Sequence, residues 1–447
     1  MMLTRAESGA KGRVDWALVF AASSLALIGT LAVFSAASPL ASYASILRTH
    51  FMALALGALL FLLGMNFNYQ IFQDQAKAVY FVALALLAIV LVAGSAHRGH
   101  RAWLHMGFFT FQPAELARVV MILVLAAFLD ARARKMRDLS TILYTMALAA
   151  PVMVLILKQP DFSTALTFLP IMLGMLFCGG ADIAHLLAFV GYGLTTIAMP
   201  LVYTFVRFHS AELKTEAAAR FVMRTSHFGA ATASVLLAAA ALCLIAWRLS
   251  VLLRLRLRAA YFAAIPVVLS AGVLSGIFVN GQMKGYQRDR FVAYVAPQAD
   301  IQGAAYHVHQ SQIAIGSGGP WGKGLFNGTQ SQLGFLPERH TDFIFSVVGE
   351  EMGFLGTMAI LCLYLLLIWR IVAIAKLARD RYGFLVCVGL ATMFAFELTL
   401  NVGMCLGLMP VAGIPLPLIS YGGSSLVITL WSLGIVANVY SRRYALL

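Results

Sequence analysis

Charged residues inside apolar segments are the first candidates for chemistry in this sequence, because a charge at membrane depth is costly and tends to mark function. Residues 111–120 read FQPAELARVV, where Glu115 and Arg118 lie at spacing i, i+3 and share one helix face. Two interpretations stay open for them: a structural ion pair, or an Arg118 that faces a substrate phosphate. Glu397 and Asn401 share a face at i, i+4, and a packing role and a functional role stay equally open there.

Further acids stand at the ends of apolar runs. In LKQPDFSTAL, Lys158 and Asp161 flank a proline, and Asp161 can act either as a helix N-cap or as an acid or base. In PERHTDFIFSVVGEE, we expect Asp342 just inside a span, with Glu350 and Glu351 two turns deeper. An apolar helix that holds three acids predicts a functional role for them more than a packing role.

A stretch rich in proline and glycine, MPVAGIPLPLISYGGSS at 409–425, interrupts the apolar sequence near the C-terminus. Irregular backbone at membrane depth is tolerated only where protein buries it or where it lines a water-filled cavity. The sequence therefore predicts a cavity wall that includes Pro415, Ser420, Gly422 and Gly423.

The elements that position these residues are membrane helices. The chain has 447 residues, of which 61% are hydrophobic and only 11% charged, whereas soluble domains carry roughly 25% charged residues. Because a span needs roughly 20 apolar residues, we predict an all-α, polytopic helix bundle with about twelve spans. The predicted spans are 15–38, 50–66, 76–95, 113–131, 140–157, 162–179, 182–206, 231–248, 261–279, 342–371, 384–408 and 418–440.

The net charge of +14 follows the predicted topology. With the N-terminus inside, the basic stretches 130–138, 247–258 and 376–381 all fall in short cytoplasmic loops. Both termini are then cytoplasmic as well. The charge therefore indicates membrane orientation, and a nucleic-acid partner is not expected. The five cysteines form no CxxC pair, so the sequence predicts neither a disulfide framework nor a zinc site.

Two long connections face outward in this topology. Residues 280–341 follow the ninth predicted span, and a loop of this length is usually functional. Residues 207–230 have mixed charge, and either a short interfacial helix or a solvated connector fits them.

Four blocks of the sequence carry a resemblance to a known family. They are HRAWLHMGFFTFQPAELAR, KQPDFSTAL, the stretch from GYQRDRFVAYVAPQAD through FLPERHTDFIFSVVGEE, and MPVAGIPLPLISYGGSS. Over nearly its whole length the chain resembles the SEDS family of shape, elongation, division and sporulation proteins. Within that family, FLPERHTDFIF resembles the RodA branch more than the FtsW branch.

The resemblance implies a single membrane domain over 1–447 in a bacterial inner membrane. The family usually has ten spans, so we interpret 207–258 as containing an inserted helix pair. The implied activity is peptidoglycan glycosyltransfer, which polymerises lipid II, the undecaprenyl-pyrophosphate-linked disaccharide-pentapeptide. A class B penicillin-binding protein is the implied partner.

The implied reaction assigns roles to outward-facing residues. A carboxylate would act as general base on the attacking sugar hydroxyl, and cationic groups or a divalent cation such as Mg²⁺ or Mn²⁺ would stabilise the leaving pyrophosphate. Trp103 would cover a sugar face or act as an interfacial anchor. The acid or base candidates are Asp161, Asp300 and Asp342. The substrate-binding candidates are Arg101, Glu115, Arg118, Lys158, Lys323, Arg339 and His340.

One position departs from the family pattern. After YQRxR the family typically reads leucine-aspartate-proline, and this aspartate is the residue most strongly implicated in catalysis. Here the segment reads Val295-Ala296-Pro297, while Asp300 matches a second, less critical aspartate. Three explanations stay open: an engineered inactive variant, a natural enzyme that uses Asp300 or another acid, or a natural non-catalytic member.

Two other functions compete with the enzyme hypothesis. A flippase for lipid-linked precursors would use intramembrane charges such as Glu115, Arg118, Glu350 and Glu397 in a midplane cavity. A scaffold that recruits a penicillin-binding protein would need no catalytic group. The long outer loop argues against the first alternative, and the acids at membrane depth argue against the second.

Overall fold

The computed structural model describes residues 14–97, 100–106, 109–208, 217–254, 259–283, 285–297 and 303–444. Its contacts divide the chain into two compact units. The first unit comprises Met1–Ala181 and His309–Leu447, and the second comprises Asp182–Val308.

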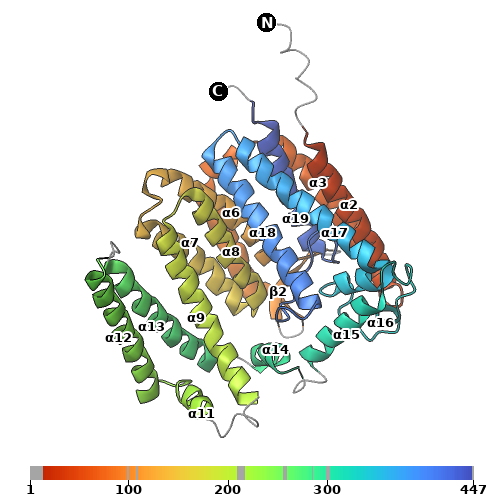
Figure 1. The fold of residues 1–447 in the computed structure, drawn as a ribbon. Helices are drawn as coiled ribbons and strands as arrows, with labels where there is room; N and C mark the ends of the chain where they lie inside the picture. Colours follow the sequence, from red (N-terminus) through yellow and green to blue (C-terminus); the bar gives the residue numbers. More distant parts are fainter. Residues whose placement is uncertain are drawn as a thin grey trace. The chain divides into compact units, whose positions relative to one another are not determined.

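Long helices dominate the first unit (Figure 1). They are α2 (Trp16–Ala37), α3 (Tyr43–Asn66), α5 (Ala76–Ala93), α6 (Pro113–Ala131), α7 (Leu139–Lys158), α8 (Phe162–Gly179), α17 (Ile344–Leu377), α18 (Arg381–Cys405) and α19 (Gly423–Ser441). The shorter elements are α4 (Gln70–Asp74), β1 (Ser95–His97), β2 (His100–Met106), β3 (Phe109–Phe111), the 3-10 helix η1 (Ala133–Lys135) and α16 (Thr329–Gln332). Helix α15 (Ala304–Ser317) crosses the boundary between the units.

All regular elements in the described residues of the second unit are helices. Its helices are α9 (Ile183–Phe208), α11 (Ala217–Arg224), α12 (Ala230–Leu252), α13 (Ala259–Gln282) and α14 (Gly285–Val295).

The predicted membrane bundle is confirmed, since each of the twelve predicted spans coincides with one long helix. In the described residues, 11 helices are long and apolar enough to cross a membrane. The twelfth, α6, has 19 residues but carries Glu115, Arg118 and Asp130. The protein is therefore a multi-pass membrane protein.

Some predicted boundaries were wrong. Helix α19 begins at Gly423, not at 418, because Leu418 has a φ of 64°, which a helix cannot accommodate. Asp342 precedes α17 instead of lying inside it. Helices α14, α15 and α16 lie within the predicted outer loop, and α11 lies within 207–230. The location of α11 at a membrane surface stays a prediction. The inserted helix pair at 207–258 and the single membrane domain over 1–447 also stay predictions.

A small antiparallel sheet, which the sequence analysis did not predict, follows α5. The strand order is β1-β2-β3, with Ser95 opposite Trp103 and Leu104 opposite Phe111. Pro113 then starts α6 at the first helical position, where its missing N–H costs no hydrogen bond. The sheet thus leads directly into the helix that carries Glu115 and Arg118.

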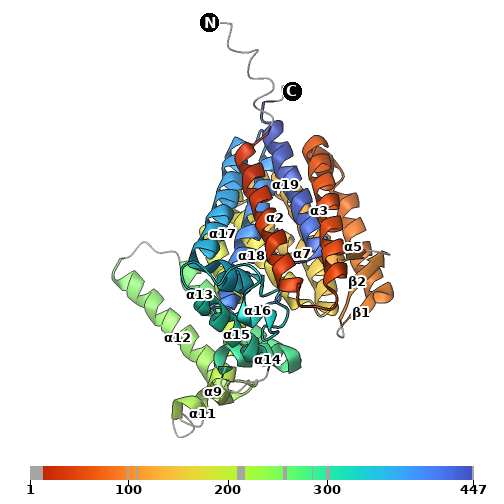
Figure 2. The ribbon, with the colours of Figure 1, turned by 90° about the vertical axis from the view of Figure 1, so that its right-hand side faces the viewer.

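Close helix contacts build the core of the first unit. Most residues of helices α6, α18 and α19 are buried. Helix α19 packs against α3 (Figure 2). A Cβ atom at Gly434 would lie 2.4 Å from the carbonyl oxygen of Phe61, so only glycine fits at this crossing.

The second unit has a similar seam between α9 and α13. A Cβ atom at Gly272 would lie 2.7 Å from the Thr195 Cβ, and one at Gly276 would lie 2.6 Å from the Met199 Cβ. This Gly-xxx-Gly spacing lets the two backbones approach closely, as in other membrane helix pairs. The Tyr192 hydroxyl also forms a hydrogen bond of 2.9 Å with the Ser275 hydroxyl.

We predict that Gly276→Leu destabilises the second unit by about 1–3 kcal/mol, because the added side chain overpacks the seam. The matched control is Gly281→Leu in the same helix, where a Cβ atom meets nothing within 4 Å. Thermal unfolding in detergent measures both variants. Equal unfolding temperatures for the two would contradict a tight seam.

Candidate active site

A buried ion triad joins α6 to α18. The Arg118 guanidinium pairs with the Glu115 carboxylate one turn away and with the Glu397 carboxylate on α18. All three side chains are buried. The predicted Glu115–Arg118 pair is therefore confirmed. Both outer nitrogens of the guanidinium bond to carboxylates, whereas its Nε has no hydrogen-bond partner among the described residues, and a phosphate role for Arg118 stays a prediction.

Asp161 lies at the start of α8 as its N-cap. Its carboxylate accepts hydrogen bonds from the Thr164 amide (3.0 Å), the Thr164 hydroxyl (2.7 Å) and the Gln112 side chain (2.9 Å). The predicted cap is therefore confirmed. Asp161 also contributes to the electrostatic field at Arg118, so it belongs to the surroundings of the triad. Lys158, the last residue of α7, is exposed.

The segment 409–422 is irregular, as predicted, and protein partners bond to its backbone. The Tyr421 amide donates to the His340 carbonyl (2.8 Å), the Asn401 side chain donates to the Ile414 carbonyl (2.8 Å), and the Leu416 amide donates to the Ser420 hydroxyl (2.7 Å). The Tyr364 hydroxyl donates to the Pro417 carbonyl. Ser420 is buried, whereas Pro415, Gly422 and Gly423 are half-buried. Protein contacts thus stabilise this backbone, and its role as a cavity wall stays a prediction.

Helix α17 is broken at Gly353, whose φ of 65° and ψ of -161° are not helical. The loop 319–324 bonds to the backbone groups beside the break. Lys323 N donates to the Glu350 carbonyl (3.0 Å), Gly324 N to the Glu351 carbonyl (3.0 Å), Phe354 N to the Gly319 carbonyl (2.8 Å) and Leu355 N to the Pro320 carbonyl (3.1 Å). A Cβ atom at Gly322 would lie 2.1 Å from the Glu351 carbonyl oxygen, so this approach requires glycine.

Glu350 fixes the next part of the loop. Its fully buried carboxylate accepts from the Lys323 ammonium (2.9 Å), the Thr329 hydroxyl (3.0 Å), the Gln330 amide (2.8 Å) and the Ser331 amide (3.0 Å). Hydrogen bonds to a charged acceptor are among the strongest in proteins. Lys323, a predicted phosphate ligand, is therefore bound to an internal acid.

Glu351 and Arg339 connect the same loop to the end of α2. The Ser35 hydroxyl donates to the Glu351 carboxylate (2.6 Å) and accepts from the Phe326 amide (3.2 Å). Arg339 is buried and donates to the carbonyls of Ala36 (2.9 Å) and Ser331. Its burial lowers the pKa of the Arg339 guanidinium from the ordinary value. Arg339 thus binds backbone oxygens, and a phosphate role for it stays a prediction.

Two histidines and a tyrosine meet near the start of α17. The Tyr421 ring lies 5.5 Å from the His340 ring and 6.4 Å from the His50 ring, measured between centroids. The Asn401 side chain donates to the Asp342 carbonyl (2.9 Å), which places Asp342 beside α18. His340 and the Asp342 backbone therefore lie close to the irregular segment before α19.

The remaining predicted residues are distributed over both units. Trp103 is a half-buried residue of β2, and Arg101 lies in the same strand. Ala296 directly follows α14 and donates its amide hydrogen to the Val292 carbonyl (2.7 Å). Asp300 lies outside the described residues.

No group of three or more His, Cys, Asp or Glu side chains within the described ranges could hold a metal ion. The buried Glu115 and Glu397 carboxylates share the Arg118 guanidinium. A divalent cation that stabilises the leaving pyrophosphate stays a prediction.

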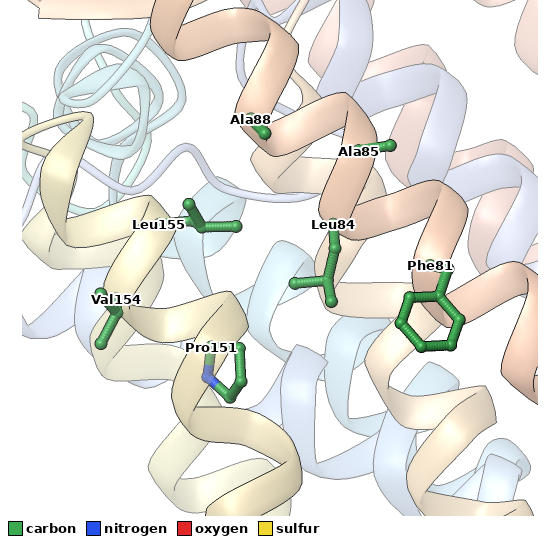
Figure 3. Close-up of a pocket in the computed structure, with 7 residues that line it drawn as sticks. All are labelled: Phe81, Leu84, Ala85, Ala88, Pro151, Val154 and Leu155. Atoms are coloured by element: carbon green, nitrogen blue, oxygen red, sulfur yellow. The ribbon is translucent and has the colours of Figure 1, made fainter.

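An apolar groove of about 560 Å³ lies between α5 and α7 (Figure 3). Leu84 of α5 and Leu155 of α7 point into the space between the two helices. The lining residues are Phe81, Leu84, Ala85, Ala88, Pro151, Val154 and Leu155. With no polar side chain, this groove suits a hydrocarbon chain and not acid–base chemistry.

The sequence analysis missed the break at Gly353 and the partners of the buried acids. Gly353 and Gly356 in GEEMGFLG were a local signal for an irregular helix. Ser35 gave no such signal, because it looks like any small residue of an apolar span and lies 316 positions from Glu351.

Comparisons with known proteins decide the family. The model of the FtsW/RodA/SpoVE cell cycle proteins matches residues 15–226 and 217–445. The chain belongs to this family.

Individual relatives agree with the family match. The chain is 32% identical to the peptidoglycan glycosyltransferase MrdB of Escherichia coli K12, over 87% of this chain and 84% of that protein. It is 32% identical to the peptidoglycan glycosyltransferase RodA of Treponema pallidum, over 96% and 98%. A structure described as a peptidoglycan synthase complex that coordinates polymerization and crosslinking contains a similar chain. That chain has a TM-score of 0.66 and 29% identity, with 97% of this chain and 99% of that chain covered.

We predict that Arg118→Gln lowers the unfolding free energy by about 3–5 kcal/mol, because it leaves two buried carboxylates without a counter-charge. Glu115→Gln costs less, because Arg118 keeps Glu397. Thermal unfolding in detergent measures both, with the exposed Lys158→Gln as control. If Glu115→Gln were as damaging as Arg118→Gln, the triad would not be the stabilising unit.

We also predict that Glu350→Gln accelerates trypsin cleavage after Lys323 at least about tenfold, because hydrogen bonds to a charged group contribute roughly 1.5–3 kcal/mol. Thr329→Val removes only one of the four donors, so its effect should be smaller. Cleavage rates of the folded protein in detergent provide the measurement. Equal rates for the unmodified chain and Glu350→Gln would show that the carboxylate does not hold the loop.

Proposed function

We propose that this chain is a peptidoglycan glycosyltransferase that polymerises lipid II into glycan strands during cell-wall elongation and shape maintenance. The observation that carries the proposal is the similarity to named peptidoglycan glycosyltransferases over up to 96% of the chain. The match thus extends beyond the spans to the long loop between α13 and α17. The RodA-like features of FLPERHTDFIF support the elongation branch of the family.

The residues of the described site fall into two groups, those that position the site and those that are candidates for the reaction. The triad and the acids of α17 hold the helices and the loop in place, so they act as positioning residues. Asp161 and Asp342, the acid or base candidates among the described residues, are half-buried. A carboxylate base would remove the proton of the attacking sugar hydroxyl while the anomeric carbon loses its lipid pyrophosphate. Cationic side chains would stabilise the charge on that leaving group.

We propose the bacterial inner membrane as the location, with both termini in the cytoplasm. The basic loops 130–138 and 376–381 support this orientation through the positive-inside rule. A class B penicillin-binding protein is the proposed partner, supported by the similarity to a chain from a complex that couples polymerization to crosslinking. The α5–α7 groove is of the apolar kind that a lipid tail requires.

The proposed base position is Ala296, where the family resemblance places aspartate. We predict that Ala296→Asp polymerises labelled lipid II at least about 100-fold faster than Ala296→Asn, because general base catalysis typically contributes 10²–10⁴-fold. The assay uses the full chain reconstituted with its penicillin-binding protein, and glycan length is determined on gels. Asparagine matches aspartate in size but cannot accept the proton at neutral pH.

Other outcomes separate the alternatives. If the chain polymerises equally well with alanine, asparagine and aspartate at 296, Ala296 is not the base position, and Asp300→Asn identifies the acid. If no variant polymerises but lipid II crosses the bilayer of liposomes, the glycosyltransferase proposal is wrong and a flippase replaces it.

A further inference from the structure

The loop between α15 and α17 turns several polar groups toward a buried acid and leaves large apolar side chains exposed. The Thr329 hydroxyl and the backbone amides of Gln330 and Ser331 donate to the buried Glu350 carboxylate. Trp321 is 80% exposed and Leu333 is 70% exposed. Water around these two side chains would be unfavourable, because exposing large apolar side chains to water costs free energy.

We call four exposed apolar side chains of this loop the interfacial patch. Its residues are Trp321, Leu325, Leu333 and Phe335, each exposed in the structure. The patch continues into the lipid-facing surface of α17, since the Leu355 amide donates to the Pro320 carbonyl (3.1 Å) and both Phe354 and Leu355 are exposed. The loop beside Trp321 therefore lies at the same depth as the first residues after the helix break.

The length of helix α17 indicates the membrane depth of this loop. Its basic end, at Lys376, marks one membrane surface. At about 1.5 Å per residue, the segment from Phe354 to Leu377 is about 36 Å long. The hydrocarbon core is about 30 Å thick and headgroup regions border it. Phe354 and the Trp321 loop therefore lie where the opposite surface of the core meets the headgroups.

The length of helix α2 indicates the same membrane depth for the loop. Asp15 caps its first turn and pairs with Arg370, which places this end near the basic surface. A span of roughly 20 residues from Trp16 ends near Ser35. The Ser35 hydroxyl accepts from the Phe326 amide and donates to Glu351. Two helices thus place the loop at the bilayer interface.

We propose that the interfacial patch is a lipid-binding surface that inserts into the headgroup and upper acyl region of the leaflet opposite Lys376. Trp321 is its anchor, because indole rings favour this depth. The buried acids bind the polar face of the loop and the leaflet covers the apolar face. The proposal does not depend on the enzymatic reaction.

The test uses the full chain labelled with 5-fluorotryptophan in lipid nanodiscs. Fluorine NMR of the unmodified protein and of Trp321→Phe identifies the Trp321 signal. We expect phospholipid carrying a spin label at the top of its acyl chain to broaden this signal, and a water-soluble gadolinium chelate to leave it sharp. Trp369, 60% exposed on α17, is the positive control for lipid contact, identified by Trp369→Phe.

Two results would overturn the proposal. If the gadolinium chelate broadens the Trp321 signal and the lipid label does not, the patch faces water. If neither reagent reaches Trp321 while the lipid label reaches Trp369, a protein surface covers the patch instead of lipid. Because Trp321→Phe is a conservative change of an exposed side chain, misfolding does not confuse the assignment.

Discussion

The backbone at the break of α17 has to find hydrogen-bond partners at membrane depth, and much of the first unit follows from this constraint. An unsatisfied N–H or C=O in lipid costs several kcal/mol. The break at Gly353 frees such groups, and the loop 319–324 binds four of them. This pairing requires glycines on both sides, and it draws the polar residues of the loop onto Glu350 and Glu351. A predicted loop thereby becomes a fixed part of the membrane fold.

Protein groups also bind the cationic side chains inside the first unit. Arg118 is bound by two carboxylates, Lys323 by Glu350 and Arg339 by backbone carbonyls. These cations therefore serve first to connect helices and loop. A flippase would need intramembrane charges that exchange partners as its cavity opens to alternate sides, whereas these contacts join α6 to α18 and the loop to α17 and α2. The arrangement favours a fixed scaffold that presents a reacting site on one face, as a glycosyltransferase requires.

The fold was largely predictable from the sequence, because each span is a long apolar run and each such run became a helix. The local features of the site were predictable too: Glu115 and Arg118 pair at i, i+3, and Asp161 caps α8. The long-range partners were not. Glu397 meets Arg118 across 279 positions and Ser35 meets Glu351 across 316, and no local pattern records such contacts. The sheet after α5 was missed because its strands are as short as three residues.

The claim that the outer loop is a fixed part of the membrane fold is tested most directly by hydrogen exchange of the full chain in nanodiscs. The decisive amides are those of Lys323, Gly324, Phe354 and Leu355, which make the four bonds at the break. The account predicts that all four exchange as slowly as amides in the middle of α18. Exchange of Lys323 and Gly324 at the rate of an open loop, with α18 protected, would contradict it.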